Sequence, residues 1–73
     1  MTTLNLGHLA TFRLVVQRGS FSAAADILGL SQPAVSLQVR QLEQFLQTRL
    51  IERTGRGIKA TAAGMALLAH GDN

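Results

Sequence analysis

The sequence predicts a small, mainly α-helical domain that carries one short β-hairpin. Three observations predict this class. Apolar residues recur at helical spacing along three stretches, and each stretch follows a possible capping residue. A basic segment after the third stretch contains two closely spaced glycines, which is typical of a tight hairpin turn. A fourth apolar stretch follows, and a length of 73 residues allows one domain.

The first predicted helix follows Asn5, whose side chain can cap it, and Gly19 offers a stop after Arg18. Its apolar positions recur three and four residues apart, so we expect them to face the core. These positions are Leu6, Leu9, Phe12, Val15 and Val16.

A second, shorter helix is predicted over "SAAADIL", capped by Ser20 or Ser22 and ended by Gly29. The run of alanines in this segment is small enough to let another helix cross closely. Leu30 then fills a tight connection to the next helix.

Ser31 caps the third predicted helix, and Pro33 lies in its first turn, where a missing N–H costs nothing. At about 100° per residue, one stripe roughly 60° wide is apolar and should face the core. This stripe consists of Val35, Val39, Leu42 and Leu46. A helix, a glycine turn and a second helix in this order predict a helix-turn-helix.

The segment "RLIERTGRGIKAT" predicts a hairpin. We expect strands over residues 49–53 and 58–60, around a turn in which Gly55 and Gly57 can take a positive φ. Two strands alone are unstable, so this hairpin must pack on the helices as a wing. Thr61 is placed to cap a fourth helix over "AAGMALLAH".

The formal net charge of +3 is concentrated in residues 49–59. That segment holds Arg49, Arg53, Arg56 and Lys59 against a single acid, Glu52. Such a cluster suggests a polyanionic partner, and the alternative is a solvated loop.

Several classes of protein are excluded by what the sequence lacks. Without cysteine there is no disulfide or thiolate metal site, and two histidines far apart make any metal site improbable. The longest uncharged apolar run, Ala62 to Ala69, is far shorter than the roughly 20 residues of a membrane span. No signal peptide, phosphate-binding loop or catalytic constellation is present. We therefore expect a cytoplasmic protein that is not an enzyme and needs no cofactor.

Uncharged polar groups line the exposed face of the third helix. Gln32, Ser36 and Arg40 share a face beside the apolar stripe, and Leu37 lies roughly opposite that stripe. Glutamine can pair with adenine, serine can bond to any base, and an apolar side chain can meet a thymine methyl group. The face therefore suits base reading in DNA, and the alternative is an indifferent surface.

The segments "SFSAAADILGLSQPAVSLQVRQLE" and "RLIERTGRGIKATAAG" closely resemble the winged helix-turn-helix DNA-binding domain of LysR-type transcriptional regulators. The resemblance covers residues 6–68. It implies a three-helix core, a two-stranded wing and a fourth helix that links or dimerises. It also implies binding to double-stranded promoter DNA as a dimer, with the third helix in the major groove and the wing at the minor groove or backbone.

The resemblance also implies roles for individual residues. Gln32, Pro33, Ser36 and Leu37 match groups that contact the operator, and Arg56 matches an arginine that enters the minor groove. Ser22 and Ser31 lie where helix caps or phosphate contacts are expected. The expected DNA-binding set is completed by the cations of the helix face and the wing, so that it comprises Ser22, Ser31, Gln32, Pro33, Ser36, Leu37, Arg40, Arg53 and Arg56.

The fourth helix, in residues 61–73, is expected to start a linker and dimerisation segment, after a DNA-binding domain in residues 1–60. Its apolar residues exceed what one small core can cover, so we expect a homodimer interface. The interface residues would be Ala63, Met65, Ala66, Leu67 and Leu68. The alternatives are packing in the core, or against an effector domain that senses a small molecule in this family and is absent from this chain.

The sequence departs from the family pattern at three positions. Leu37 replaces a frequent arginine or lysine, Gln47 replaces the glycine that usually ends the third helix, and Ile51 replaces a phenylalanine of the wing. The leucine at position 37 puts the preference for one base in doubt.

A competing function, from another class, is a winged helix that contacts an acidic protein partner.

Overall fold

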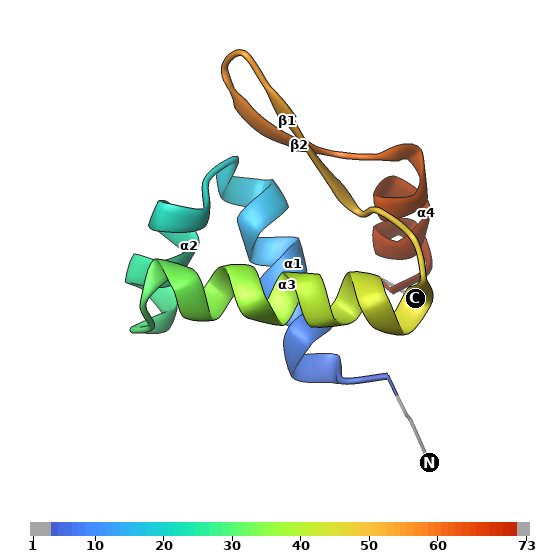
Figure 1. Cartoon of the computed structure of the whole chain (residues 1–73), viewed down its shortest axis with the longest axis horizontal. Helices are drawn as coiled ribbons and strands as arrows, with labels where there is room; N and C mark the ends of the chain where they lie inside the picture. The colour runs from blue at the N-terminus through green and yellow to red at the C-terminus, as the bar shows by residue number, and fades with distance from the viewer. Residues whose placement is uncertain (1–3, 72–73) are drawn as a thin grey trace.

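Four helices and one antiparallel hairpin follow one another in the predicted order (Figure 1). The computed structural model describes residues 4–71. The helices and strands are α1 (Leu6–Arg18), α2 (Phe21–Leu28), α3 (Gln32–Leu46), β1 (Ile51–Thr54), β2 (Gly57–Ala60) and α4 (Ala62–Gly71). The first three helices pack on one another, and α2 and α4 lie near opposite ends of α3 (Figure 1).

Side-chain oxygens cap the first three helices. Asn5 Oδ1 accepts a hydrogen bond from the His8 N–H at 3.1 Å, and Ser31 Oγ accepts one from the Ala34 N–H at 3.2 Å. Of the two serines that could begin α2, Ser20 is the cap, since its Oγ accepts from the Ala23 N–H at 3.1 Å. Ser22 lies inside α2 and is exposed.

The core is formed where α1, α2 and α3 meet the start of the wing. The largest side chains that are fully buried are Phe12, Leu42, Leu50, Val15, Val35 and Val39. The predicted stripe of α3 therefore faces the core as expected, with Leu46 packed at its margin. Leu6 of α1 was also expected to face the core, but 72% of it is exposed. The first turn of α1 projects past α3, beyond the elements that could cover it (Figure 1).

The strands of the wing are shifted from the predicted bounds. β1 begins at Ile51 rather than at residue 49, and β2 begins at Gly57 rather than at residue 58. The antiparallel register pairs Ile51 with Ala60 and Thr54 with Gly57, which leaves a turn of Gly55 and Arg56. Because β2 ends at Ala60, Arg49 and Leu50 have no strand to pair with. Of the two wing glycines only Gly57 has a positive φ, of 139°.

α4 is attached to the rest of the domain through Gly64, which is buried. A Cβ atom on Gly64 would collide with the Leu50 carbonyl oxygen and would lie 3.0 Å from the Phe12 ring. Thr61 begins the helix as predicted, because its Oγ1 accepts a hydrogen bond from the Gly64 N–H at 3.1 Å. The absence of a side chain at Gly64 therefore lets α4 lie directly against the backbone that leads into the wing.

Gln47 ends α3 in the left-handed conformation, with a φ of 52°. Its N–H donates to the carbonyl oxygens of Glu43 and Gln44. Gln47 is the only residue other than glycine with a positive φ among residues 4–71. The backbone therefore keeps the conformation that favours glycine, at the position where the resemblance implied a glycine.

Candidate nucleic-acid interface

The first half of α3 presents its predicted polar face to solvent. Gln32, Pro33 and Arg40 are exposed, Ser36 is half-buried, and Leu37 is 50% exposed. Ser31 is also exposed and already accepts the capping hydrogen bond, which leaves its hydroxyl hydrogen available. The core stripe and the cap together hold this row of side chains in one orientation on a rigid helix.

A hydrogen bond between α1 and α3 directs Gln38 away from the exposed face. The Thr11 hydroxyl of α1, which is buried, lies 2.6 Å from Gln38 Oε1 of α3 and hydrogen-bonds to it. Gln38 is thereby turned towards α1 and away from the exposed face. The exposed face of α3 therefore includes Gln32, Ser36, Leu37 and Arg40, and it does not include Gln38.

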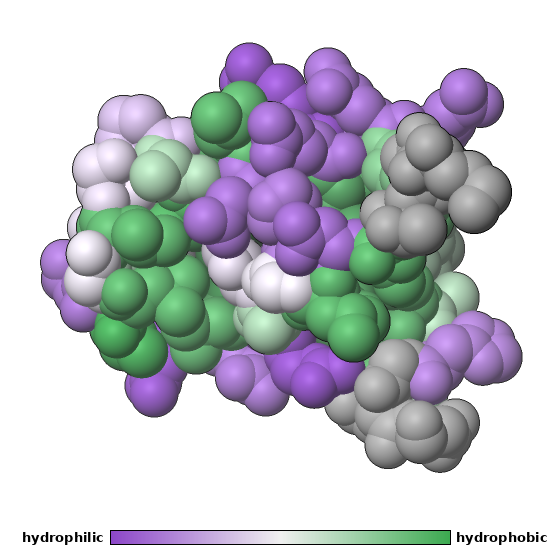
Figure 2. Space-filling view, turned by 90° about the horizontal axis from the view of Figure 1, so that it is seen from below, coloured by the Kyte–Doolittle hydropathy of each residue, from purple (hydrophilic) through white to green (hydrophobic). Residues whose placement is uncertain are grey.

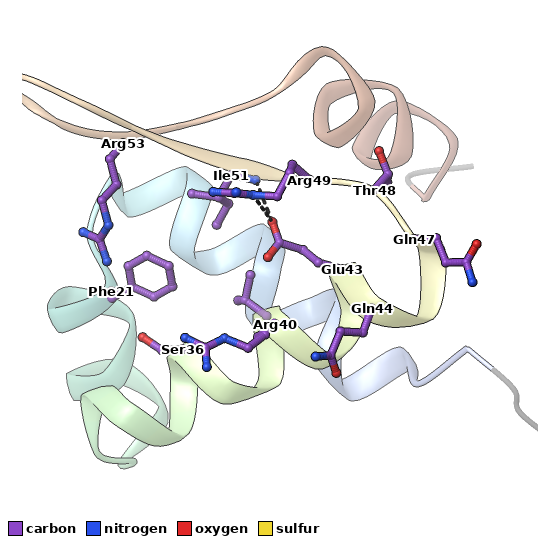
Figure 3. A pocket seen from close by; sticks show the side chains of 11 residues that line it. Phe21, Ser36, Arg40, Glu43, Gln44, Gln47, Thr48, Arg49, Ile51 and Arg53 are labelled. Atoms are coloured by element: carbon purple, nitrogen blue, oxygen red, sulfur yellow. Dashed lines mark hydrogen bonds and ion pairs between the residues drawn. The ribbon is translucent and has the colours of Figure 1, made fainter.

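A groove of about 600 Å³ separates α3 from the wing (Figure 3). Arg40 from α3 and Arg53 from β1 extend into it from opposite sides, and Ser36 lies on its helical wall (Figure 3). Arg49 also lines it. The structure thus brings together three predicted site residues, Ser36, Arg40 and Arg53, around a cationic space between two elements.

Arg53 is held over an aromatic ring. Its guanidinium carbon lies 5.9 Å from the centre of the Phe21 ring, which begins α2. An arginine in this position is attracted by the electron-rich ring face. The contact directs the Arg53 side chain across the groove towards α2 instead of along the wing.

Glu43 is a residue that sequence reasoning missed. Its Oε2 accepts hydrogen bonds from the backbone N–H groups of Leu50 at 2.8 Å and Ile51 at 3.3 Å. Its side chain is 19% exposed and lies 3.9 Å from the Nε of Arg49, which is 80% exposed (Figure 3). The available signal was an acid beside the core stripe of a helix that is otherwise uncharged or basic.

Arg56 lies in the turn of the wing, the part of the hairpin farthest from the helices (Figure 1). The turn is tied by the Arg56 N–H, which donates to Thr54 Oγ1 at 3.2 Å. Along the hairpin, Lys59 and Glu52 face each other and form an ion pair at 3.2 Å. Lys59 is thus compensated locally, and Arg56 remains exposed at the tip.

The remaining predicted residues lie away from the groove. Ser22 lies on α2, near one end of α3, and α4 lies near the other end (Figure 1). On α4, Ala63, Met65 and Ala66 are exposed, whereas Leu67 and Leu68 are half-buried against the core. On the face opposite the wing, hydrophobic side chains gather at both ends with a hydrophilic band between them (Figure 2).

Three helices that include a helix-turn-helix, followed by an antiparallel hairpin, define a winged helix-turn-helix. Residues 6–65 match the family model of bacterial regulatory helix-turn-helix proteins of the lysR family. The chain belongs to this family, and it is a DNA-binding domain of the LysR type. The expected fold class and family are thereby confirmed, and the family is one of transcriptional regulators rather than enzymes.

Individual relatives agree with this assignment. The chain is 49% identical over 65 residues to an uncharacterised HTH-type transcriptional regulator of Azotobacter vinelandii, which covers 89% of this chain and 45% of that protein. A crystal structure of a CbnR DNA-binding domain bound to DNA has 41% identity and a TM-score of 0.84, covering 90% of this chain and 76% of that one. The corresponding BenM complex with catB site 1 DNA has 39% identity and a TM-score of 0.77, covering 93% and 84%.

The chain spans less than half the length of these curated relatives. It covers 45% of the Azotobacter vinelandii regulator and 21% of a probable RuBisCO transcriptional regulator of Chlorokybus atmophyticus. Within residues 4–71, no helix is long and apolar enough to cross a membrane. In the same part of the chain, no group of three or more potential ligand residues could hold a metal ion.

Proposed function

We propose that this chain recognises a specific sequence in double-stranded promoter DNA, with α3 in the major groove and the wing against the adjoining backbone and minor groove. One observation carries this proposal. The exposed face of α3, which carries the groups that can read base edges, borders a groove through Ser36 and Arg40, and Arg53 supplies a guanidinium group from the opposite wall. Base contacts supply sequence choice and cations supply affinity, so the two walls have complementary tasks.

On α3, we assign base reading to the exposed residues of the first two turns. Gln32 can form paired hydrogen bonds with adenine, and Ser36 can donate to or accept from a base edge. Leu37 is 50% exposed and offers an apolar contact to a thymine methyl group, in place of the cation frequent in the family. Pro33 contributes contact area beside them.

Backbone contacts are assigned to the cations and serines around this face. Arg40 and Arg53 lie on either side of the groove, where a phosphodiester strand passing between the major and minor grooves would meet both. Ser22 and Ser31 are exposed hydroxyls near the start of α2 and α3 and suit phosphate contacts. Arg56 at the wing tip is assigned to the minor groove, whose negative potential attracts arginine.

We also propose that the protein acts as a homodimer, in the cytoplasm, through the segment that begins after residue 60. In α4, Met65 is 59% exposed, and Ala63 and Ala66 are exposed on a helix with no charged residue through Ala69. Leu67 and Leu68 have a second, structural task, because they already pack on the core. Residues 72 and 73 of this segment lie outside the described residues. Small-molecule sensing is assigned to a part of the regulator beyond this chain.

Selection of bound duplexes from a randomised pool tests the proposal. The expected result is one recurring motif, bound at least about 1,000-fold more tightly than random duplex, with affinity that falls linearly in log salt. Gln32→Ala should relax choice at one base pair and weaken binding to the selected site by about 1–3 kcal/mol. Gln17→Ala, an exposed glutamine of α1, is the matched control. A chain that selected no motif would instead be a protein-contact module.

A further inference from the structure

An acidic side chain occupies the cationic groove. Glu43 lines the same space as Arg40, Arg49 and Arg53, and its carboxylate is turned towards the base of the wing (Figure 3). A negative charge beside a path proposed for phosphates opposes binding through its charge alone. We therefore expect Glu43 to make a favourable contribution to the structure that outweighs its repulsion of phosphate groups.

The hydrogen bonds of Glu43 show what that contribution is. One oxygen, Oε2, accepts from the N–H groups of Leu50 and Ile51, the residues at which the chain enters the wing. These two residues are 1% and 6% exposed. With β1 beginning at Ile51, the N–H of Leu50 has no strand partner, so Glu43 satisfies a buried donor that would otherwise be unpaired.

The same stretch of chain is held from its other side. The Leu50 carbonyl oxygen accepts a hydrogen bond from the Thr61 N–H at 3.0 Å, at the start of α4. Thr61 Oγ1 also donates to the carbonyl oxygen of Arg49 at 2.6 Å. Leu50 is therefore bonded through its N–H to α3 and through its C=O to the end of the wing, and Glu43 is the only one of these partners that lies on the recognition helix.

We propose that Glu43 is the positioning residue that fixes the wing relative to α3, so that Arg56 reaches its DNA contact while α3 occupies the major groove. This inference rests on the proposed function. Without the carboxylate, the burial of Leu50 and Ile51 still keeps the wing attached to the core. Its angle to α3 is then no longer set by a hydrogen bond, and the binding energy of Arg56 is partly lost in orienting the wing.

Charge and hydrogen bonding can be separated at this position. In Glu43→Gln, Oε1 can accept both backbone N–H groups, but the negative charge is gone. In Glu43→Ala, both the acceptor and the charge are gone. Glu52 provides matched controls, Glu52→Gln and Glu52→Ala, because it is an exposed acid of the same wing and forms an ion pair with the Lys59 side chain.

The binding test is a double-mutant cycle with Arg56→Ala, measured on the duplex that the unmodified chain selects from a random pool. In the unmodified chain and in Glu43→Gln, Arg56→Ala should weaken binding about 10-fold or more. In Glu43→Ala the same change should weaken binding less than about 3-fold, which is the non-additivity expected of coupled residues. Glu52→Ala and Glu52→Gln should leave the effect of Arg56→Ala at its full size.

A measurement without DNA tests the positioning directly. Amide hydrogen exchange at Leu50 and Ile51 should accelerate about 10-fold or more in Glu43→Ala and much less in Glu43→Gln, with both proteins still folded by circular dichroism. Either of two results overturns the inference. One is unchanged exchange in Glu43→Ala. The other is an additive cycle, whether or not the Glu43 variants bind more tightly through loss of a repulsive charge.

Failure of the inference and failure of the proposed function give different results. If the unmodified chain selects no duplex, the function fails and the role in DNA binding falls with it, whatever the exchange rates show. If it selects a duplex and the cycle is additive, DNA recognition stands and only the positioning role of Glu43 is wrong.

Discussion

Substituting Gly64 with alanine should destabilise the domain, although alanine is the better helix former. A helix interior gains about 1 kcal/mol when glycine becomes alanine. At Gly64 the added Cβ would collide with the Leu50 carbonyl oxygen and lie 3.0 Å from the Phe12 ring and 3.3 Å from the Ala60 Cβ. Overpacking costs about 1–3 kcal/mol, and a backbone carbonyl cannot rotate away as a flexible side chain can, so the upper end applies.

The net change is a loss of about 2 kcal/mol, which lowers the melting temperature by about 10 °C for a domain of this size. Thermal unfolding followed by circular dichroism measures it, at one protein concentration, because association would shift the midpoint. Gly55→Ala is the matched control, since Gly55 has no positive φ and an added methyl group would find open space around it. A melting temperature of Gly64→Ala equal to or above that of the unmodified chain would refute the reasoning.

Two further substitutions test other parts of the structure. Gln47→Gly should stabilise the domain by about 0.5–1 kcal/mol, because glycine relieves the left-handed strain at φ 52° at some cost in unfolded-state entropy. Urea unfolding should show a higher midpoint with an unchanged slope, and a lower midpoint would contradict the assignment of strain. Met65→Glu should convert a dimer to a monomer in sedimentation equilibrium without unfolding α4, since Met65 is 59% exposed and glutamate favours helices. Gln17→Glu is its control for charge, and equal mass in both variants would remove the dimer proposal.

Local signals in the sequence predicted most of the helix ends, although they left the start of α2 open between Ser20 and Ser22 and did not mark the end of α3 at Gln47. Asn5 and Ser31 cap through bonds to residues three positions on, and Gly19 and Gly29 end helices with positive φ, so each signal acts within one turn. The stripe of α3 was predictable because Val35, Val39 and Leu42 face one direction whatever packs against them. Leu6 has the same periodicity and is exposed, because periodicity does not show where the neighbouring helix ends.

Features that depend on the approach of distant segments could not be predicted. The bounds of β1 follow from the register with β2, and the sequence shows no register. The bond from Glu43 to Leu50 joins residues seven positions apart across a helix end, where the direction of the chain depends on the conformation of Gln47. The exposed face of α3 was predicted, but the pairing of Arg53 with Phe21 required the position of the wing.

Leu50 is hydrogen-bonded through both its N–H and its C=O, and this anchoring determines where the hairpin can bend. Beyond this root, Arg53 lies over the Phe21 ring and Gly57 lies beside the Gly19 carbonyl oxygen, so both strands of the hairpin are also held near the helices. We therefore expect adjustment to duplexes with different groove widths to occur in the turn of Gly55 and Arg56, while the root stays in place. The wing would then keep a constant point of attachment at Leu50 and an adjustable turn at its tip.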